Sequence, residues 1–570
     1  MMRRATGSAH LSSTNCAATP AAAVFSALST LRASGPRRTA LLLRRGMSTS
    51  GTDADAEAVR REAVKLPETI SSFIDGSYRS ENEGTTKNRR ALVNPSTGEV
   101  VQAMVLASES DVDDVIGSTK KAQGHWATIP ASERAQILHN AAEILDRRNE
   151  ELAFLEAFDT GRPIQETMVV DIKSASDCLR YMAGVSRGLT GQHVHLSGPG
   201  DAGGSFCYVR REPLGVTAGI GAWNYPLQGC VWKAAPALAM GNGMVFKPSE
   251  ETPLTALAFA EVLIEAGVPP GVFNVVLGEG DVGAALCSHR DVHKVSFTGS
   301  AATGRKVAEA AGLNLKKVTL EMGGKSPLIV FEDADLENAV SAAMIGNWYS
   351  CGEVCSNGTR VFVHKKMKEQ FLESLLARTS MLRIGDPLDM ETHIGPLVSA
   401  AHRDKVTGFV ERAASDGAEV VSCDNHAEYL RGIKSSERKG HLAGGFFVSP
   451  TIITGASDDM EIAKEEVFGP VMTILEFEST DEVISRANAT PYGLAAGIFT
   501  NDLRRAHRAS AALDAGTVWV NNYNLTPVEV PWGGFKASGI GFENGPEAMM
   551  QWTRPKTVYI EMGDVDSPYN

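Results

Sequence analysis

The sequence has little of what marks a membrane-spanning, disulfide-bonded or nucleic-acid-binding protein. Among its 570 residues, no apolar run reaches the roughly 18 residues that a membrane-spanning helix needs. Eight cysteines in so long a chain do not form a disulfide framework, and a nucleophilic thiol suits a reducing compartment. The formal net charge of -13 gives a nucleic acid little electrostatic support as a partner. We expect a soluble globular chain, and its hydrophobic fraction of 43% suffices for two or three domains.

The first 52 residues lack acidic side chains, but they carry seven arginines and many serine, threonine and alanine residues. This composition predicts a transit peptide over 1–52, directed to the mitochondrion or, alternatively, to a plastid. A secretory signal is the competing interpretation, because Ala21 to Leu31 is mildly apolar, but arginines on both sides of that run argue against it. Met47 follows two arginines and Gly46, so it marks either a nearby cleavage point or the start of a shorter cytosolic form.

Cys355 is the candidate nucleophile, because it lies among small, turn-forming residues that follow an apolar helical run. The stretch from Asn347 to Arg360 reads NWYSCGEVCSNGTR. Thiolate attack needs a low-pKa sulfur in a partly exposed, polar setting, which these neighbours provide. The alternative for a single cysteine is a buried structural role. Cys351 could join Cys355 as a metal ligand, but no second Cys or His pair stands at zinc spacing, so no metal is predicted.

From Gly215 onward, apolar strands alternate with helices, which predicts βαβ units and a parallel sheet. Ligands of such sheets bind beyond the carboxyl ends of the strands, where KPSE follows MVF and TGS follows KVSF. Lys247 can bond ribose oxygens, and Glu250 can bind both adenosine-ribose hydroxyls while repelling a 2′-phosphate, which favours NAD over NADP. A solvated charged turn is the alternative for KPSE. Gly278 to Gly283 fits a phosphate-loop pattern, but its two acids would face pyrophosphate, so we interpret it as a strand-to-helix turn.

Several ordered motifs resemble the NAD(P)-dependent aldehyde dehydrogenase superfamily. They are GIGAWNYPLQGCVWK around Asn224, LEMGGKSP around Glu321, the Cys355 segment before its TR pair, and FKPSE, FTGS, EEVFGPV and PWGGFKASG. The resemblance runs from about Ile70 to about Met562. It implies an α/β fold with a Rossmann-type parallel-sheet cofactor domain, a second α/β catalytic domain and a small β oligomerisation domain.

The resemblance also assigns roles to residues. Cys355 would be the nucleophile, Glu321 the general base, and the Asn224 amide, with the Cys355 N–H, the oxyanion donor. Glu321 argues for a free acid as product, since family members that transfer the acyl group to coenzyme A lack it. Glu353 stands where relatives commonly carry Gln, and it would either raise the thiol pKa or point away. The implied cofactor-binding residues are Trp223, Lys247, Ser249, Glu250, Gly299, Ser300, Gly304, Gly323, Glu466 and Phe468.

Aromatic residues indicate a substrate class. Tyr225, Trp232, Tyr349 and Trp532 match positions that surround a quaternary ammonium in relatives oxidising betaine aldehyde and 4-trimethylaminobutyraldehyde. Each facing ring attracts such a cation by roughly 0.5 to 2 kcal/mol. The alternative is a hydrophobic tunnel for a neutral aliphatic or aromatic aldehyde. Glu166 and Asp171 could add negative potential at the tunnel mouth, but we expect them on a solvated helix face.

We predict a division into a leader, two larger domains and two flanking segments. The ranges are 1–52 for the leader, 65–195 and 214–324 for the NAD-binding domain, 325–540 for the catalytic domain, and 196–213 and 541–570 for oligomerisation. The flanking pieces SFCYVRREP and TVYIEM alternate like exposed strands and would promote aggregation if left unpaired, so we expect a homo-oligomer, a dimer or tetramer.

Two other classes of function remain as alternatives. A thioesterase-like cysteine hydrolase would need Cys355 and a base but no dinucleotide site. A non-catalytic binding protein would have no reason to keep Asn224, Glu321 and Cys355 together. The best-supported expectation from the sequence is therefore oxidation of a small-molecule aldehyde with NAD.

Overall fold

The computed structural model describes residues 69–79, 88–196, 204–423, 429–431, 436–565 and 567–569. All of them belong to one unit, Val64–Asn570. The predicted leader over 1–52 lies outside the described residues and stays a prediction. No helix in the described part of the chain combines the length and the hydropathy that a membrane crossing requires.

The first of two large sheets carries the predicted cofactor motifs. Its strands, in spatial order, are β19 (Gly539–Ile540), β11 (Lys317–Met322), β10 (Val292–Gly299), β7 (Val216–Ile220), β8 (Gly243–Lys247), β9 (Phe273–Val275), β1 (Phe73–Ile74) and β2 (Ser77–Tyr78). The five strands from β11 to β9 run parallel, and antiparallel strands close both edges. Every residue of β7 and β8 is buried, as expected for parallel strands covered on both faces.

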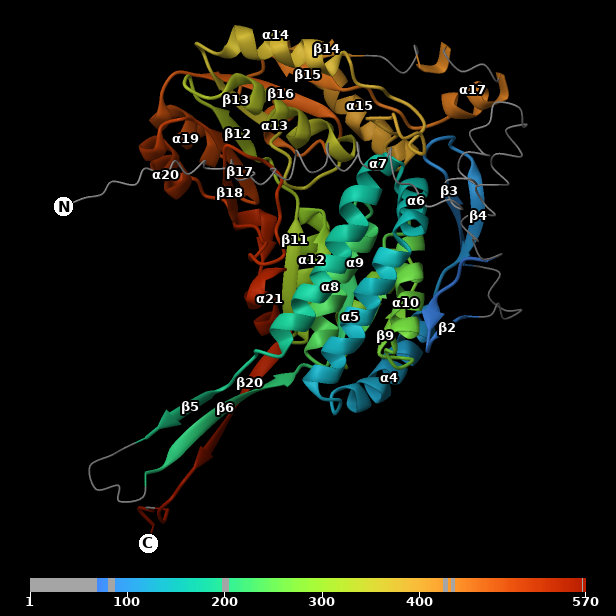
Figure 1. Ribbon diagram of the computed structural model, residues 1–570, viewed down its shortest axis with the longest axis vertical. Helices are drawn as coiled ribbons and strands as arrows, with labels where there is room; N and C mark the ends of the chain where they lie inside the picture. The colour runs from blue at the N-terminus through green and yellow to red at the C-terminus, as the bar shows by residue number, and fades with distance from the viewer. Residues whose placement is uncertain are drawn as a thin grey trace, which may run out of the picture. The chain divides into compact units, whose positions relative to one another are not determined.

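The helices of this half connect its strands and cover them. They are α4 (Glu109–Trp126), α5 (Ala131–Arg147), α6 (Asn149–Thr160), α7 (Ile164–Glu166), the π-helical turn η1 (Thr167–Asp171), α8 (Ile172–Ser186), α9 (Pro226–Ala239), α10 (Leu254–Ala266), α11 (Gly280–Ser288) and α12 (Ala301–Leu313). Helices α5, α8, α9 and α10 pack against one another as a layer (Figure 1). Apolar side chains of α4, α11 and α12 join those of β7, β8, β10 and β11 in one core cluster.

The second large sheet follows in sequence and is also mostly parallel. In spatial order it contains β14 (Glu419–Ser422), β15 (Thr451–Thr454), β16 (Val471–Phe477), β13 (Arg360–His364), β12 (Pro327–Val330), β17 (Ala495–Phe499) and β18 (Thr517–Val520). Only β14 is antiparallel to its neighbour. The remaining helices are α13 (Leu336–Trp348), η2 (Tyr349–Gly352), α14 (Lys368–Thr379), α15 (Ala400–Ser415), α17 (Ser436–Ala443), α18 (Glu461–Lys464), α19 (Thr480–Asn488), α20 (Leu503–Ala512), η3 (Lys536–Ser538) and α21 (Gly545–Gln551).

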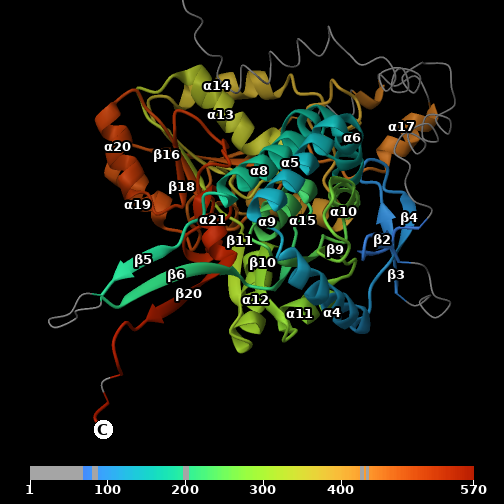
Figure 2. The same cartoon turned by 60° about the horizontal axis from the view of Figure 1, so that its bottom comes forward.

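Two small sheets complete the fold. In one, β20 (Thr553–Ile560) pairs antiparallel with β6 (Phe206–Pro213), which pairs with β5 (Gln192–His195). These three strands lie side by side in both Figure 1 and Figure 2. The other is the hairpin of β3 (Arg89–Val93) and β4 (Val100–Val105).

The predicted domain ranges differ from the sheets at two strands. β5 falls inside 65–195, the range predicted as cofactor domain, but it belongs to the small sheet because it pairs with β6 along its whole length. β19 falls inside 325–540, the range predicted as catalytic domain, but it pairs with β11 and closes the edge of the first sheet. The predicted division between 324 and 325 lies between β11 and β12, which belong to different large sheets.

Candidate active site

A strained turn precedes Cys355, which lies in the loop between η2 and β13. Helix α13 ends at Trp348, and Ser350 and Cys351 then adopt left-handed backbone angles, with φ of +52° and +55°. Such angles cost a non-glycine residue roughly 1 to 3 kcal/mol and persist only where the surroundings enforce them. At Gly352, a Cβ would lie 2.2 Å from a backbone carbon of Gly469, so only glycine fits there. The turn therefore fixes the path of the chain just before the nucleophile.

The Cys355 thiol is half-buried and its pKa is raised to about 12. Burial is the largest cause, followed by the charges of Glu466 and Glu321. The low pKa expected from the polar neighbours is therefore wrong, because the segment is more enclosed than its composition indicates and the charges of two carboxyl groups act on the sulfur. Attack by this thiol requires a nearby group that takes its proton.

Glu321 is a buried carboxyl group without hydrogen-bond partners. It lies near the end of β11, and neither carboxyl oxygen has a partner within the described residues. Burial raises its pKa well above the ordinary value, and Glu543 raises it further while Lys233 acts against this. A buried carboxyl group without partners among the described residues, with a raised pKa, can accept a proton.

Asn224 reaches the nucleophile turn from the loop between β7 and α9. Its Nδ2 donates to the backbone oxygen of Glu353 at 2.8 Å, and its own backbone oxygen accepts from Arg162 at 3.2 Å. The structure thus brings together Asn224, Glu321 and Cys355, which come from three separate elements. Their catalytic roles stay predictions on this geometry.

A buried ion pair next to Glu321 was missed by the sequence analysis. Lys233 Nζ donates to Glu543 Oε1 and to Thr298 Oγ1, both at 2.7 Å, and Ser296 donates to the same carboxyl oxygen at 2.8 Å. The sequence feature that could have indicated this pair is a lysine inside the mainly apolar helix α9, since a fully buried lysine needs a partner.

The predicted adenosine side of the cofactor site lies at the ends of β8 and β10. Lys247 and Ser249 are buried, while Glu250 is half-buried and accepts from Lys247 Nζ at 3.4 Å. Gly299 ends β10 and Ser300 caps the amino terminus of α12, whose first-turn N–H groups suit phosphate oxygens. At Gly304 a Cβ would lie 2.2 Å from Met322 Sδ. This close approach sets the helix end beside β11, so the residues present fit a dinucleotide.

The predicted nicotinamide side is formed by Gly323, Glu466, Phe468 and Trp223. Glu466 accepts from the Gly324 N–H at 3.1 Å and fills the space that a Cβ at Gly323 would need. Phe468 has a left-handed φ of +62°, and its ring contacts Trp223 edge to face at 5.2 Å. His402, which no motif indicated, donates to the Phe468 carbonyl at 2.6 Å and also contacts Trp223.

Comparison with known proteins decides the family. The chain matches the aldehyde dehydrogenase family over residues 82–558. It belongs to that family. It is 51% identical over 506 residues to the betaine aldehyde dehydrogenase of Brucella anthropi and 52% identical to that of Mesorhizobium japonicum, in each case covering 89% of this chain and 100% of the relative.

Solved structures agree with the sequence relatives. PnpE in complex with nicotinamide adenine dinucleotide is 38% identical with a TM-score of 0.82, covering 88% of this chain and 99% of PnpE. The NAD+ complex of aldehyde dehydrogenase from Bacillus cereus is 39% identical with a TM-score of 0.81, covering 88% and 98% of the two chains. The predicted family, fold class and enzyme class are therefore confirmed.

The predicted substrate rings of this aldehyde dehydrogenase fall into two groups. Trp232 and Trp532 are buried with ring centroids 6.4 Å apart, and Trp519, which the sequence analysis did not single out, lies 6.3 Å from Trp532. Tyr225 is hydrogen-bonded through its hydroxyl to Ser350 at 2.6 Å, next to Tyr349 in the chain. No ring contact joins the two groups among the described residues, so their shared role stays a prediction.

Glu166 and Asp171 correct the expectation of a solvated helix face, because both are buried. Each approaches Arg162, whose side chain is fully buried. The turn η1 interrupts the regular helix between them and places both carboxyl groups on its inner side. Glu353 is also fully buried, and its side chain faces the Val398 N–H and His402.

Proposed function

We propose that this aldehyde dehydrogenase oxidises an aldehyde bearing a trimethylammonium group, betaine aldehyde or 4-trimethylaminobutyraldehyde, to the free acid with NAD. The observation that carries the substrate class is the buried edge-to-face pair of indole rings, Trp232 and Trp532, whose centroids lie 6.4 Å apart. Aromatic faces attract a quaternary ammonium, so a carboxylate is not needed to bind it. Relatives named betaine aldehyde dehydrogenase, at 51 to 52% identity over their whole length, support the same class.

NAD is the oxidant. Two similar structures contain it, and the carboxylate of Glu250, which follows β8 and contacts Lys247, supports NAD because it would repel a 2′-phosphate. Ser300 and Glu466 would hold NAD, which when bound would supply the acceptor for the hydride of the substrate carbon.

The covalent step begins at Cys355. Its sulfur bonds to the aldehyde carbon as its proton passes to Glu321 or Glu466, the two carboxyl groups whose charges raise the pKa of the thiol. Asn224 Nδ2 and the Cys355 N–H donate to the new oxyanion, and loss of one such donor typically costs about 3 kcal/mol. Collapse of the tetrahedral carbon expels hydride and leaves a thioester on Cys355.

Hydrolysis of the thioester completes the cycle. Glu321 takes a proton from water as the water oxygen attacks the acyl carbon, and the carbon–sulfur bond breaks to release the acid and Cys355. The unpartnered oxygens of Glu321 are free for this water. The balance is aldehyde, water and NAD⁺ converted to acid, NADH and a proton.

A pair of isosteric substrates tests the substrate class. A trimethylammonium aldehyde and its tert-butyl analogue have nearly the same shape, so the ratio of their kcat/KM isolates the cation. Two or three rings at about 1 kcal/mol each predict a ratio on the order of tens to hundreds. Trp532→Leu should raise KM several-fold for the cationic aldehyde only. Phe535 carries an exposed ring three residues further on, and Phe535→Leu should leave KM unchanged for both aldehydes. Equal rates for both aldehydes would instead indicate a general hydrophobic tunnel.

We further propose that the chain self-associates through the sheet of β5, β6 and β20. Tyr208 and Tyr559, on adjacent strands of that sheet, leave apolar surface exposed that a partner strand or sheet would cover. For the leader over 1–52, the arginine-rich and acid-free composition supports a mitochondrial destination, with a plastid or a cytosolic form starting at Met47 as alternatives.

A further inference from the structure

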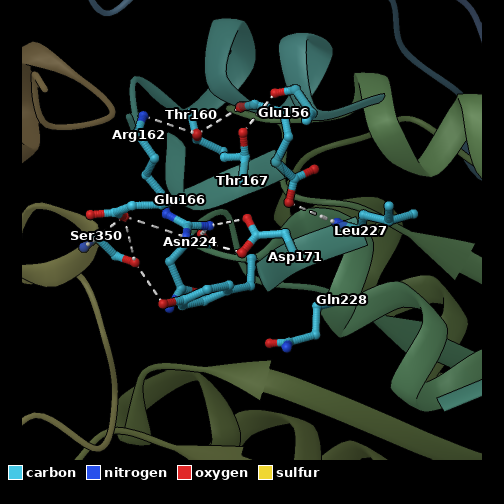
Figure 3. A network of polar contacts seen from close by, with 12 residues as sticks. Glu156, Thr160, Arg162, Glu166, Thr167, Asp171, Asn224, Leu227, Gln228 and Ser350 are labelled. Carbon is cyan, nitrogen blue, oxygen red and sulfur yellow. Dashed lines mark hydrogen bonds and ion pairs between the residues drawn. The ribbon is translucent and has the colours of Figure 1, made fainter. Parts of the chain in front are cut away.

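We propose that Arg162 is a positioning residue that holds the oxyanion donor Asn224, acting as one unit with Asp171 and Glu166. Figure 3 shows Arg162, Glu166 and Asp171 together with Asn224 and Ser350. The inference rests on the role given to Asn224 in the proposed function. It adds a buried set of residues that sets the geometry of the transition-state site by holding Asn224.

Backbone geometry aims Arg162 at the site. Gly161 ends α6 with φ of +80°, and a Cβ there would lie 2.8 Å from Pro396, so the chain turns sharply at a position that only glycine fits. The Arg162 side chain that follows is fully buried. Its guanidinium lies 4.0 Å from the centre of the Tyr225 ring and donates to the Asn224 backbone oxygen at 3.2 Å.

Asp171 fixes the guanidinium in that orientation. Nη1 of Arg162 donates to Asp171 Oδ2, and Nη2 donates to Oδ1 at 3.1 Å. A two-bond fork of this kind sets the plane of the guanidinium as well as its position. The remaining direction of Nη1 then points at Asn224, so the carboxylate determines where the oxyanion donor's backbone sits.

The π-helical turn η1 makes this arrangement possible. Glu166 and Asp171 are five residues apart, a spacing that places them on different sides of a regular α-helix. In a π-turn, residues five apart are hydrogen-bonded neighbours and share a side. Thr167 anchors the turn by donating to the Ala153 carbonyl of α6 at 2.8 Å.

Glu166 extends the cluster to the nucleophile. Its Oε2 accepts from the Ser350 N–H at 3.0 Å, and Ser350 Oγ is hydrogen-bonded to the Tyr225 hydroxyl at 2.6 Å. Ser350 is the first residue of the left-handed turn before Cys355. One buried guanidinium therefore positions both oxyanion donors. It holds the Asn224 amide through the Asn224 backbone, and it holds the Cys355 N–H through Glu166 and Ser350.

A double-mutant cycle in the full chain tests the inference. Arg162→Lys keeps the charge but loses the fork. A misplacement near 1 Å can cost about 100-fold, so we expect Arg162→Lys to lower kcat by about 10- to 100-fold with KM for NAD within about twofold. In an Asn224→Ala background the same change should cost clearly less than it does alone, because the amide that it positions is already gone and only the contribution through Glu166 and Ser350 remains. Equal losses in both backgrounds would overturn the inference.

Hydrolysis of a p-nitrophenyl ester separates this inference from the proposed substrate. Acylation of Cys355 by the ester needs the oxyanion donors but neither NAD nor a trimethylammonium group. The coupling between Arg162 and Asn224 should therefore appear in ester hydrolysis even if the aldehyde class is wrong. Full ester and aldehyde rates in Asn224→Ala would overturn both the inference and the oxyanion role.

Two further variants guard against misfolding. If Arg162→Lys does not fold, Asp171→Asn runs through the same cycle, since it removes one acceptor of the fork with little change of shape. Arg180→Lys is the matched control, because Arg180 pairs with Asp146 on the same helix layer at the surface. It should leave kcat and the melting temperature unchanged. An Asp171→Asn loss that persists in full beside Asn224→Ala would contradict the inference.

Discussion

Cys355 and Glu321 have different tasks because their surroundings differ. The thiol faces two carboxyl groups that raise its pKa to about 12 together with burial. Neither buried oxygen of Glu321 has a hydrogen-bond partner among the described residues, so we expect Glu321 to bind and deprotonate a water molecule. Glu466 remains beside the sulfur when Glu321 is altered. Hydride transfer and hydrolysis should therefore respond differently to the loss of Glu321.

We expect Glu321→Gln to give one burst of NADH and then to stall at the thioester, because only hydrolysis depends on this base. The burst should approach one equivalent per active site, and turnover should fall by about 100- to 10,000-fold. Stopped-flow fluorescence of NADH measures both. Cys355→Ala should show no burst. A full steady-state rate in Glu321→Gln would remove this glutamate from the mechanism.

At the level of elements, the sequence predicted the positions of the cofactor motifs relative to the strands. KPSE follows β8 and TGS follows β10, and both lie at the carboxyl ends of parallel strands as expected. The surroundings of Glu166 and Asp171 could not be predicted, because a single π-turn changes which side of a helix a residue faces. Lys233 escaped notice because its partner, Glu543, is distant in sequence and is brought near only by the fold.

β20 carries the prediction about assembly. Its residues from Thr553 to Ile560 pair with Pro213 to Phe206 of β6. Deleting Thr557 to Asn570 removes half of these pairs and opens the edge of β6, so the oligomer mass measured by light scattering should fall. Removing only Gly563 to Asn570 keeps every pair and should leave the mass unchanged. An unaltered mass after the longer deletion would show that β20 has no part in assembly.

On the scale of the whole molecule, buried acids link stability to pH. Burial, the largest cause for each, raises the pKa of Glu156 and Glu166 to about 8 and that of Glu466 to about 7. In an unfolded chain such groups titrate near their ordinary value of about 4.3. Their stabilising contribution is complete below that value and is lost as pH rises through 7 to 8, because ionisation then favours the unfolded chain.

We expect the melting temperature to fall between pH 6 and pH 9, and to fall less steeply in Glu166→Gln, which has no proton to lose. Differential scanning fluorimetry across that range measures both slopes. Glu143→Gln, an exposed glutamate on α5, is the control and should keep the wild-type slope. A flat profile in the unaltered protein, or equal slopes in both variants, would contradict this assignment.

The segment that ends in β20 also contains Trp532, one of the rings that we propose to bind the substrate. Trp532 and Glu543 exchange two backbone hydrogen bonds of 2.7 Å, Glu543 holds Lys233, and the chain then continues through α21 into β20. A displacement of β20 would therefore be passed to Trp532 through α21 and the Glu543 backbone hydrogen bonds. The strand that we propose for subunit contact and the ring that we propose for substrate binding therefore belong to one continuous stretch of chain.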